Sequence, residues 1–212
     1  MENIYRITHI NLRQKEWWKE IPEVQLENFP WGKNSNEDYR PVTSARLGIT
    51  THSDGCESLS VYMETNETNL RIQEKGFGHV HTDSCMEFFL SPCHDDFPKY
   101  MNFEFNPAGA MYLAIGDSRQ DRTALPLENY RELFQVKTNV YDKGWNLEWH
   151  IPVSFLRQYF TSVDFSSGKI MRGNFYKCGD LTVHPHYGCW SPIDLPKPDF
   201  HTPAFFGTLV ID

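Results

Sequence analysis

Carboxylate, amide, guanidinium and phenol side chains alternate with apolar ones along several short stretches of the sequence. Glu87 lies between Cys85 and Phe89, and two further sets alternate in the same way: Asn102, Glu104 and Asn106, then Arg172, Asn174 and Tyr176. In a strand, the members of each set would share one face. Amide, carboxylate, guanidinium and phenol groups hydrogen bond to sugar hydroxyls, while aromatic rings stack on the apolar face of a pyranose. The pattern therefore predicts a sugar-binding sheet face, with an ordinary solvated face as the alternative.

The carboxylates also raise the question of catalysis. Glycoside hydrolysis needs two carboxylates across the scissile bond, and Glu87, Glu104 and Glu148 could supply them. The sequence contains no nucleophile elbow, phosphate loop or cofactor fingerprint beside them. We therefore expect acids that orient a ligand or support the structure, and no catalytic residue. A hydrolase acting on O-glycosyl compounds is the alternative.

Two histidine pairs supply a competing metal hypothesis. His79 and His81 are two residues apart, as are His184 and His186. In an extended chain each pair would point to one side, as metal ligands often do. We expect instead that these histidines make hydrogen bonds, to the protein or to a ligand, and predict no metal site.

The elements that must position these residues are short strands. Runs that alternate apolar and polar residues recur from about position 43 onward, separated by Gly, Pro, Asn and Asp. The expected strands are 43–50, 59–63, 84–91, 100–106, 111–115, 133–140, 145–151, 169–178 and 206–211. One short helix is expected after Pro152, because proline is tolerated at the first helical position. The pattern predicts an all-β fold.

Aromatic residues fall into a strand group and a loop group. Strand parity assigns the first group to the core: Phe88, Phe103, Phe105, Trp145 and Trp149. The second group lies in loops that contain proline or glycine and offers candidate sugar platforms: Trp31, Phe77, Trp190 and Phe200. The stretch 184–203 holds five prolines, so it cannot be a central strand, and we expect an irregular arm laid over the sheets.

Composition limits the function classes. The 212 residues include 20 basic and 28 acidic ones, for a net charge of -8, without a basic run, so nucleic acid is not an expected partner. No apolar run of about 18 residues and no signal peptide is found, so we expect a cytoplasmic protein that does not cross a membrane. The five cysteines form no C-x-x-C pair and are expected to be reduced thiols. We expect one domain over 1–212, in which 1–42 is an N-terminal arm packed on the sheets; the oligomeric state is open.

Five segments, taken in order, resemble the family 9 carbohydrate-binding modules and in particular their stand-alone relatives. They are 83–89, 102–106 with Gly109, 145–152, 172–176, and 189–192 with 199–207; the last contains a Pro-x-x-Phe-Gly motif before the final strand. The resemblance spans about positions 43 to 212. It implies an antiparallel β-sandwich, jelly-roll or immunoglobulin-like, that holds a glycan end in a cleft between two aromatic rings.

The resemblance carries over residue by residue. Glu87 matches the family's acidic ligand, and Asn174 and Tyr176 fall on its Asn-x-Gln strand. Phe200 stands where better-known modules have Trp, and Glu104 stands where they have an arginine that reaches the sugar. In place of a second Trp, the loop before Asp83 offers other rings: Phe77, His79 and His81.

Some relatives bind calcium, and the wider sandwich superfamily includes haem-binding domains. Asp95-Asp96 is the acidic doublet in this chain that could bear on calcium, and we predict no cofactor. Met86, Met101 and Met111 fall on the apolar faces, so they are expected in the core rather than on iron, although a haem- or metal-binding sandwich is a second alternative.

The sequence thus predicts non-catalytic binding of a mono- or oligosaccharide, linked to carbohydrate catabolism. The predicted ligand-binding residues are Phe77, His81, Glu87, Glu104, Asn106, Arg172, Asn174, Tyr176, Trp190 and Phe200.

Overall fold

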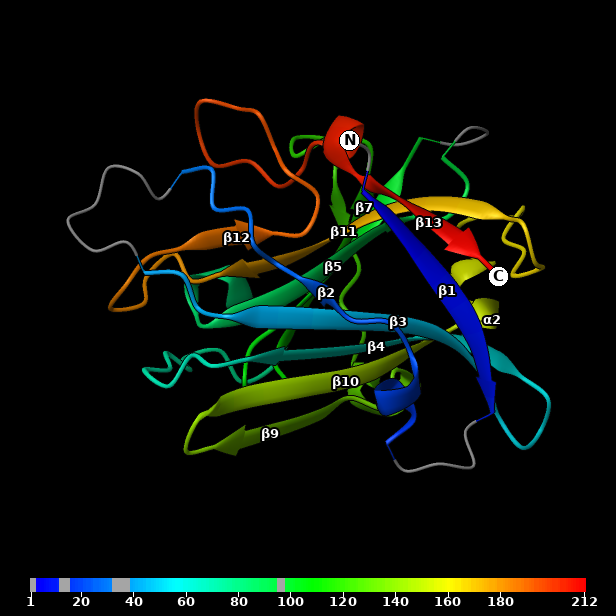
Figure 1. Ribbon diagram of the computed structural model, residues 1–212, viewed down its shortest axis with the longest axis horizontal. Coiled ribbons are helices and arrows are strands. Elements are labelled where there is room, and N and C mark those ends of the chain that lie inside the picture. Colours follow the sequence, from blue (N-terminus) through cyan, green and yellow to red (C-terminus); the bar gives the residue numbers. More distant parts are fainter. Residues whose placement is uncertain (1–2, 12–15, 32–38, 95–97) are drawn as a thin grey trace.

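The computed structural model describes residues 3–11, 16–31, 39–94 and 98–212. The chain forms two β-sheets that pack face to face around a shared core (Figure 1). The doublet Asp95-Asp96, considered for calcium, lies outside the described residues. The two packed sheets confirm the predicted all-β sandwich.

The first sheet carries the strands that contain Glu87 and Glu104. Its neighbouring strands, in order, are β8 (Thr123–Ala124), β7 (Met111–Gly116), β6 (Tyr100–Phe105), β5 (Cys85–Ser91), β11 (Ile170–Cys178) and β13 (Gly207–Ile211). A short strand, β12 (Tyr187–Cys189), also pairs with β11. All of these pairings are antiparallel, as expected.

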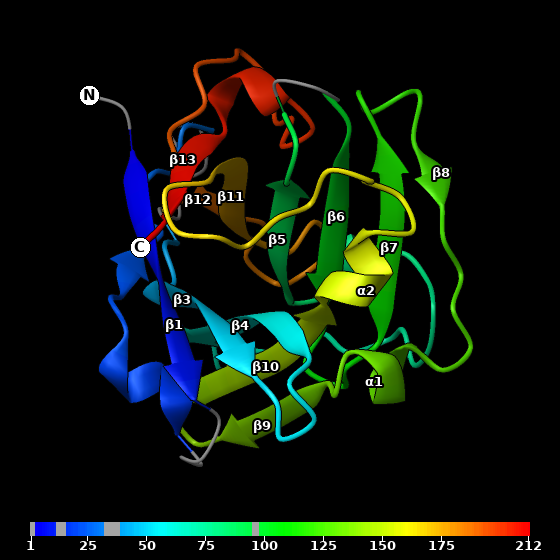
Figure 2. The ribbon, with the colours of Figure 1, turned by 90° about the vertical axis from the view of Figure 1, so that its right-hand side faces the viewer.

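The second sheet is smaller and lies against the first as a separate layer (Figure 2). Its strands, in order, are β3 (Thr43–Thr51), β4 (Glu57–Thr65), β10 (Gly144–Pro152) and β9 (Lys137–Tyr141), with β2 (Val24–Gln25) paired to β3. These pairings are antiparallel too.

The first strand, β1 (Ile4–Asn11), connects the two sheets. Its first half pairs in parallel with β13, and its second half pairs in parallel with β3. Tyr5 and Ile7 are buried while Ile4 and Arg6 are exposed, so the alternation of a strand begins at the N-terminal end of the described chain. We expected residues 1–42 to be an arm on the sandwich, but this part of the segment is a strand inside it.

Helical segments are short. The α-helices are α1 (Tyr130–Leu133) and α2 (Val153–Leu156), and the 3-10 turns are η1 (Trp17–Glu20), η3 (Val80–Thr82) and η4 (Pro203–Phe205). Helix α2 follows Pro152 as predicted. The strand predicted over 133–140 begins only at Lys137, because α1 places Tyr130 and Phe134 on one buried face at helical spacing. Among the residues described here, no helix is both long and apolar enough to cross a membrane.

The core between the sheets is built from the residues that strand parity selected. Phe88, Phe103, Phe105, Trp145 and Trp149 are all fully buried there, which confirms the prediction. The three methionines considered for iron, Met86, Met101 and Met111, are also fully buried in this core, as expected. All five cysteines lie in the described part of the chain, and none of them forms a disulfide there.

Two polar networks are buried, one around Lys177 and one under η1 on the outer face of the second sheet. The Lys177 Nζ atom lies 2.8 Å from Glu67 Oε2 and 2.8 Å from His186 Nε2. On the second sheet, Glu148 Oε1 accepts a hydrogen bond from Trp17 Nε1 at 3.0 Å and lies 3.0 Å from His150 Nε2. The second network fixes η1 on the sheet, because Trp17 is itself almost fully buried.

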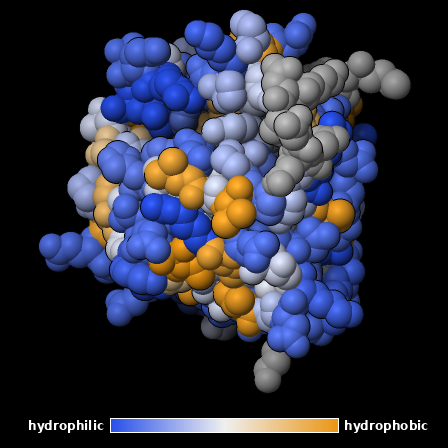
Figure 3. Space-filling model, turned by 90° about the vertical axis from the view of Figure 1, so that its left-hand side faces the viewer, coloured by the Kyte–Doolittle hydropathy of each residue, from blue (hydrophilic) through white to orange (hydrophobic). Residues whose placement is uncertain are grey.

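Large apolar side chains are rarely exposed on the described surface. Figure 3 shows that the left-hand side of Figure 1 is mostly hydrophilic, with a group of apolar residues near the middle of that face. The exposed large apolar residues of the described chain are Ile4, Val42, Val140, Ile170, Leu181 and Val183. Scattered residues of this kind are normal on a protein surface.

Candidate functional site

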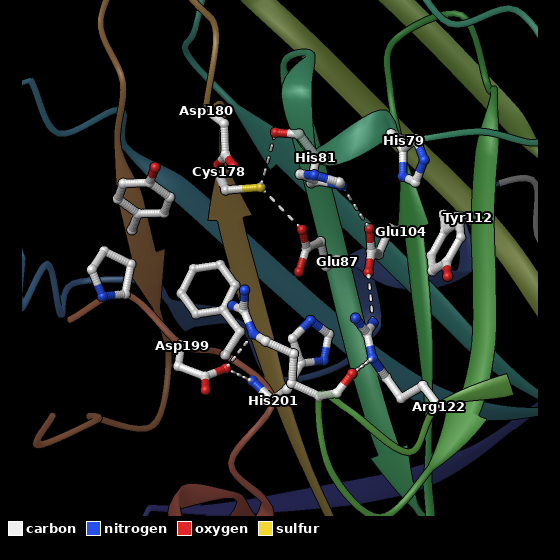
Figure 4. Close-up of a pocket in the computed structure, with 14 residues that line it drawn as sticks. His79, His81, Glu87, Glu104, Tyr112, Arg122, Cys178, Asp180, Asp199 and His201 are labelled. Carbon is white, nitrogen blue, oxygen red and sulfur yellow. Dashed lines mark hydrogen bonds and ion pairs between the residues drawn. The ribbon is translucent and has the colours of Figure 1, made fainter. Parts of the chain in front are cut away.

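A pocket of about 440 Å³ lies on the face of the first sheet that points away from the core (Figure 4). Its volume is within the range of about 300–1,000 Å³ that is common for small-molecule sites. Strands β5, β6, β7 and β11 form its floor, and η3 and the segments 117–122 and 198–201 form its rim. Segments that are distant in sequence therefore contribute to one concave site.

The floor is a single row of side chains across four neighbouring strands. Tyr176 of β11 lies directly opposite Glu87 of β5, Glu87 lies opposite Glu104 of β6, and Glu104 lies opposite Tyr112 of β7. Figure 4 shows Glu87 and Glu104 side by side between Cys178 and Tyr112. The row places two carboxyl groups between two aromatic rings.

Both acids are almost completely buried, with 2% of Glu87 and 3% of Glu104 exposed. Burial raises the pKa of each carboxyl, and the neighbouring charge of Glu87 raises the pKa of Glu104 further. Asn102 Nδ2 donates to Glu104 Oε1 at 2.9 Å, whereas Glu104 Oε2 has no hydrogen-bond partner among the described residues. Two buried carboxyls this close favour a state in which the pair keeps a proton.

Two thiols lie next to the acid pair. Cys85 and Cys178 are opposite each other on β5 and β11, and Cys178 Sγ donates to Glu87 Oε1 at 3.0 Å. The donor atoms of Cys85, Glu87 and Cys178 lie within 4.8 Å of one another, close enough for a metal ion. Burial raises the pKa of Cys85 to about 12, and the hydrogen bond with Cys85 raises the pKa of Cys178 well above its ordinary value. The thiols therefore hold their protons and act as hydrogen-bond donors in this cluster.

Two arginines reach the rim from the segment after β7. Arg119 Nε donates to Asp199 Oδ1 at 3.0 Å, which ties this segment to the proline-rich arm. Arg122 Nη1 donates to Asn102 Oδ1 at 3.4 Å and lies 4.0 Å from Glu104 Oε1. A guanidinium is thus present beside Glu104, although it comes from a loop rather than from β6.

Two histidines at the rim, His81 and His201, are uncharged at neutral pH. His81 Nδ1 lies 4.0 Å from Glu104 Oε2, and burial lowers the pKa of His81. Burial also lowers the pKa of His201 to about 2, with the charges of Arg122 and Arg119 acting in the same direction. His201 Nδ1 lies 3.0 Å from the Tyr100 hydroxyl, which can donate to it. These rings offer hydrogen bonds rather than positive charge.

Aromatic rings stand on both sides of the acid pair. On one side, Phe200 stacks on Tyr176, and Tyr187 meets Phe200 edge to face, with centroids 6.2 Å apart. On the other side, Tyr112 stacks with His79 at 6.0 Å and packs against Phe77 at 5.3 Å. The pocket can therefore offer apolar ring faces and polar groups to the same ligand.

The structure brings part of the predicted set together. Glu87, Glu104, His81 and Phe200 line the pocket. Tyr176 lies beneath Phe200, and its hydroxyl donates to the Phe200 carbonyl oxygen at 3.2 Å, so Tyr176 supports the pocket. The remaining pocket positions come from strand β7, the end of strand β11 and the rim.

Six predicted residues do not line the pocket, and besides Tyr176 and Phe77 these are four residues whose side chains are used elsewhere. Asn106 Oδ1 accepts from the backbone N–H groups of residues 108 and 110, in a turn that needs Gly109 at φ 69°. Asn174 Nδ2 donates to the Ser191 carbonyl oxygen at 2.9 Å, and Arg172 Nη1 donates to Thr208 Oγ1 at 2.6 Å. Trp190 is 6% exposed and packs in the core against Tyr5 and Phe175.

The remaining candidates have supporting positions. Phe77 packs against the core and Tyr112, and Trp31 Nε1 donates to the Leu195 carbonyl oxygen while its ring lies against Phe200. The two histidine pairs do not converge: His79 and His81 line the pocket, whereas His186 is buried beside Lys177.

Sequence reasoning missed several pocket residues: Tyr112, Arg119, Arg122, Asp180, Tyr187 and Pro198. The sequence could have indicated Tyr112, because it lies between Met111 and Leu113. In a strand it must therefore face away from the core, as Glu104 does. The arginines come from a polar loop, and their position depends on how that loop folds over the sheet.

The comparisons with known proteins agree with this geometry. The profile of carbohydrate-binding family 9 matches residues 15–211. No curated protein matches the chain. A candidate carbohydrate-binding protein from Bacteroides uniformis is similar along its whole length, with 29% identity, 100% coverage of both chains and a TM-score of 0.83.

Two more solved structures share the fold. Both are family 9 modules from Caldicellulosiruptor kristjanssonii, one in complex with cellotriose and one in complex with glucose. The first is 13% identical, with a TM-score of 0.65, and the match covers 99% of this chain and 93% of the module. The second is 14% identical, with a TM-score of 0.63, and the match covers 99% and 96%.

Proposed function

Because the chain belongs to carbohydrate-binding family 9, we propose that its pocket binds a sugar without cleaving it. The sugar is either the end of a glycan or a small oligosaccharide. The observation that carries the proposal is the floor row, in which Glu87 and Glu104 lie between the rings of Tyr176 and Tyr112. This arrangement matches a pyranose, whose hydroxyls lie at its edge and whose ring faces are apolar.

Each group has a role in the proposal. Glu87 and Glu104 bind sugar hydroxyls at the floor, and Arg122 adds a donor at the rim. Phe200 and Tyr112 provide the ring faces, and Tyr176 keeps Phe200 in place through the stacked pair and its hydrogen bond. We also propose that residues 1–212 act as one carbohydrate-binding domain that serves carbohydrate catabolism.

Calorimetric titration with glucose and cellotriose, the sugars bound by the two structural neighbours, tests the proposal. Glu87→Ala and Arg122→Ala are expected to weaken binding. Arg172→Ala is the matched control, because Arg172 does not line the pocket and its guanidinium donates to Thr208.

Absence of heat with these sugars and with a broad glycan panel at millimolar concentration would refute the proposal. The same titrations, followed by an assay for new reducing ends, separate binding from hydrolysis. Product release that Glu104→Gln abolishes would support the hydrolase alternative instead.

A further inference from the structure

The acid pair on the pocket floor is unusual because its two members face each other directly. Glu87 and Glu104 are opposite residues on adjacent antiparallel strands, a position in which Cβ atoms are about 4.5–5.5 Å apart. Both residues are at least 97% buried. Two ionised carboxylates repel strongly at this separation when water is excluded, as in other sites where two acids share a proton.

The groups around the pair do not supply enough positive charge to ionise both acids. Arg122 is 4.0 Å from Glu104 and Arg119 is paired with Asp199, while Asp180 adds a negative charge beyond β11. The other titratable groups that face the pair are kept uncharged at neutral pH, Cys178 by its hydrogen bond with Cys85 together with burial, and the rest by burial: His81, His201, Cys85, Tyr176 and Tyr187. His79 and Tyr112 complete the set of titratable residues at the pocket.

One oxygen of the pair has an unmet hydrogen bond. Glu104 Oε1 accepts from Asn102, but Glu104 Oε2 is buried and has no hydrogen-bond partner among the described residues. It lies at the pocket floor, 4.0 Å from the His81 ring. Buried polar atoms nearly always have a partner, so this atom points to a group that a ligand supplies.

We propose that Glu87 and Glu104 bind an uncharged sugar as a pair that shares one proton, so that one carboxyl donates to a sugar hydroxyl while the other accepts from one. This inference rests on the proposed function and assigns its specificity to the pair. A protonated Glu104 supplies a donor at a position where an ionised carboxylate could only accept. Sugar hydroxyls both donate and accept, so a mixed pair satisfies two of them.

The proposal requires binding to depend on pH in a defined direction. When the pair loses its shared proton, the donor is lost, and sugar binding then requires the carboxyl pair to take up a proton from solvent. Because burial raises the pKa of both acids, the pair loses this proton at a pH above the usual range of carboxyl pKa values. Affinity should then fall by up to about tenfold per pH unit once the pair is ionised.

Calorimetric titration of glucose and cellotriose from pH 5 to pH 9 tests this, with wild type, Glu104→Gln and the control Glu128→Gln, which changes an exposed carboxyl. The Gln amide always donates, so we expect Glu104→Gln to bind with a nearly flat pH profile while wild type and Glu128→Gln lose affinity. Repeating the titration at high pH in buffers of different ionisation enthalpy should show proton uptake in wild type and none in Glu104→Gln.

The outcomes separate the two proposals. Wild-type binding with the same affinity at pH 5 and pH 9, or a Glu104→Gln profile as steep as that of wild type, overturns the shared proton but leaves sugar binding intact. Failure of both sugars and of the glycan panel at every pH overturns the proposed function, and the shared-proton inference falls with it.

Discussion

The rings of Tyr176 and Phe200 lie face to face, with centroids 4.1 Å apart and planes 12° apart. Tyr176 belongs to strand β11, whereas Phe200 belongs to the proline-rich arm. The Tyr176 hydroxyl also donates to the Phe200 carbonyl oxygen. The pair therefore attaches one wall of the pocket to its floor.

Phe200→Ala should weaken sugar binding roughly threefold to tenfold, because an aromatic contact contributes about 0.5–1.5 kcal/mol beyond its buried area. Phe200→Trp, which enlarges the ring, should retain binding. Phe205→Ala is the control, since Phe205 packs nearby without lining the pocket. Calorimetric titration with cellotriose measures all three, and equal affinities for Phe200→Ala and Phe205→Ala would count against Phe200 as a platform.

The acid pair should reduce the stability of the folded protein as the pH rises. Burial raises the pKa of Glu87 from 4.5 to about 7 and the pKa of Glu104 well above its ordinary value. A carboxyl whose pKa is higher in the folded than in the unfolded protein contributes stability at low pH. That contribution is lost as the pH rises through the pKa of the folded state. Wild type should therefore lose stability between about pH 5 and pH 8.

Glu104→Gln should be more stable than wild type at pH 8, by about 1–3 kcal/mol, with little difference at pH 5. Urea denaturation at both pH values measures the effect, with Glu128→Gln as the control. An equal effect of Glu104→Gln at the two pH values would mean that the pair does not ionise in this range. A stability gain from removing a pocket acid is also what a functional rather than a structural residue would show.

Lys177→Met should destabilise the protein by about 3–5 kcal/mol, because it leaves the Glu67 carboxylate buried without its cation. Lys177 is fully buried and Glu67 is 1% exposed. Lys177→Met combined with Glu67→Gln should recover part of the loss, since no unpaired charge is left. Denaturant unfolding of the single and double variants tests this, and a double variant less stable than Lys177→Met would contradict it.

Glu148→Gln should destabilise the attachment of η1 at neutral pH. Burial opposes ionisation of Glu148, but hydrogen bonds from His150 and Trp17 and the charge of Lys137 outweigh it and lower the pKa. This contribution is present above the unfolded carboxyl pKa and is lost as the pH falls through the folded value. The variant should thus cost about 1–2 kcal/mol at pH 7 and much less at pH 3. Urea denaturation at both pH values measures this cost. A loss of stability at pH 3 as large as that at pH 7 would contradict the role given to the Glu148 carboxylate.

Strand parity predicted which residues face the core and which face away. It could not predict the pocket, because parity leaves register undetermined: sliding a strand by two residues keeps every side chain on its face. Asn106 and Glu104 share a parity, yet the register places Glu104 in the floor row and Asn106 in a turn. Glu87 was predicted as a ligand because it matches the acidic position of the family motif, which strand parity alone does not identify.

Loop residues were harder to place. Trp190 and Phe200 both lie in the proline-rich segment, but Trp190 enters the core beside Tyr5 while Phe200 lines the pocket. The position of Trp190 depends on its contact with Tyr5 of β1, and we expected residues 1–42 only as an arm. Arg122 was missed because a loop fold, rather than a periodic pattern, carries it to Glu104.

The position of β1 between β13 and β3 also bears on how the chain folds. Tyr5 lies in register with Leu209 of β13, so the two sheets are joined by residues from opposite ends of the described sequence. Such a contact must close nearly the longest loop in the molecule before it gains any stabilisation. We therefore expect a topology-limited folding time of about milliseconds to seconds, measurable by stopped-flow refolding, and a final step that completes both sheets together.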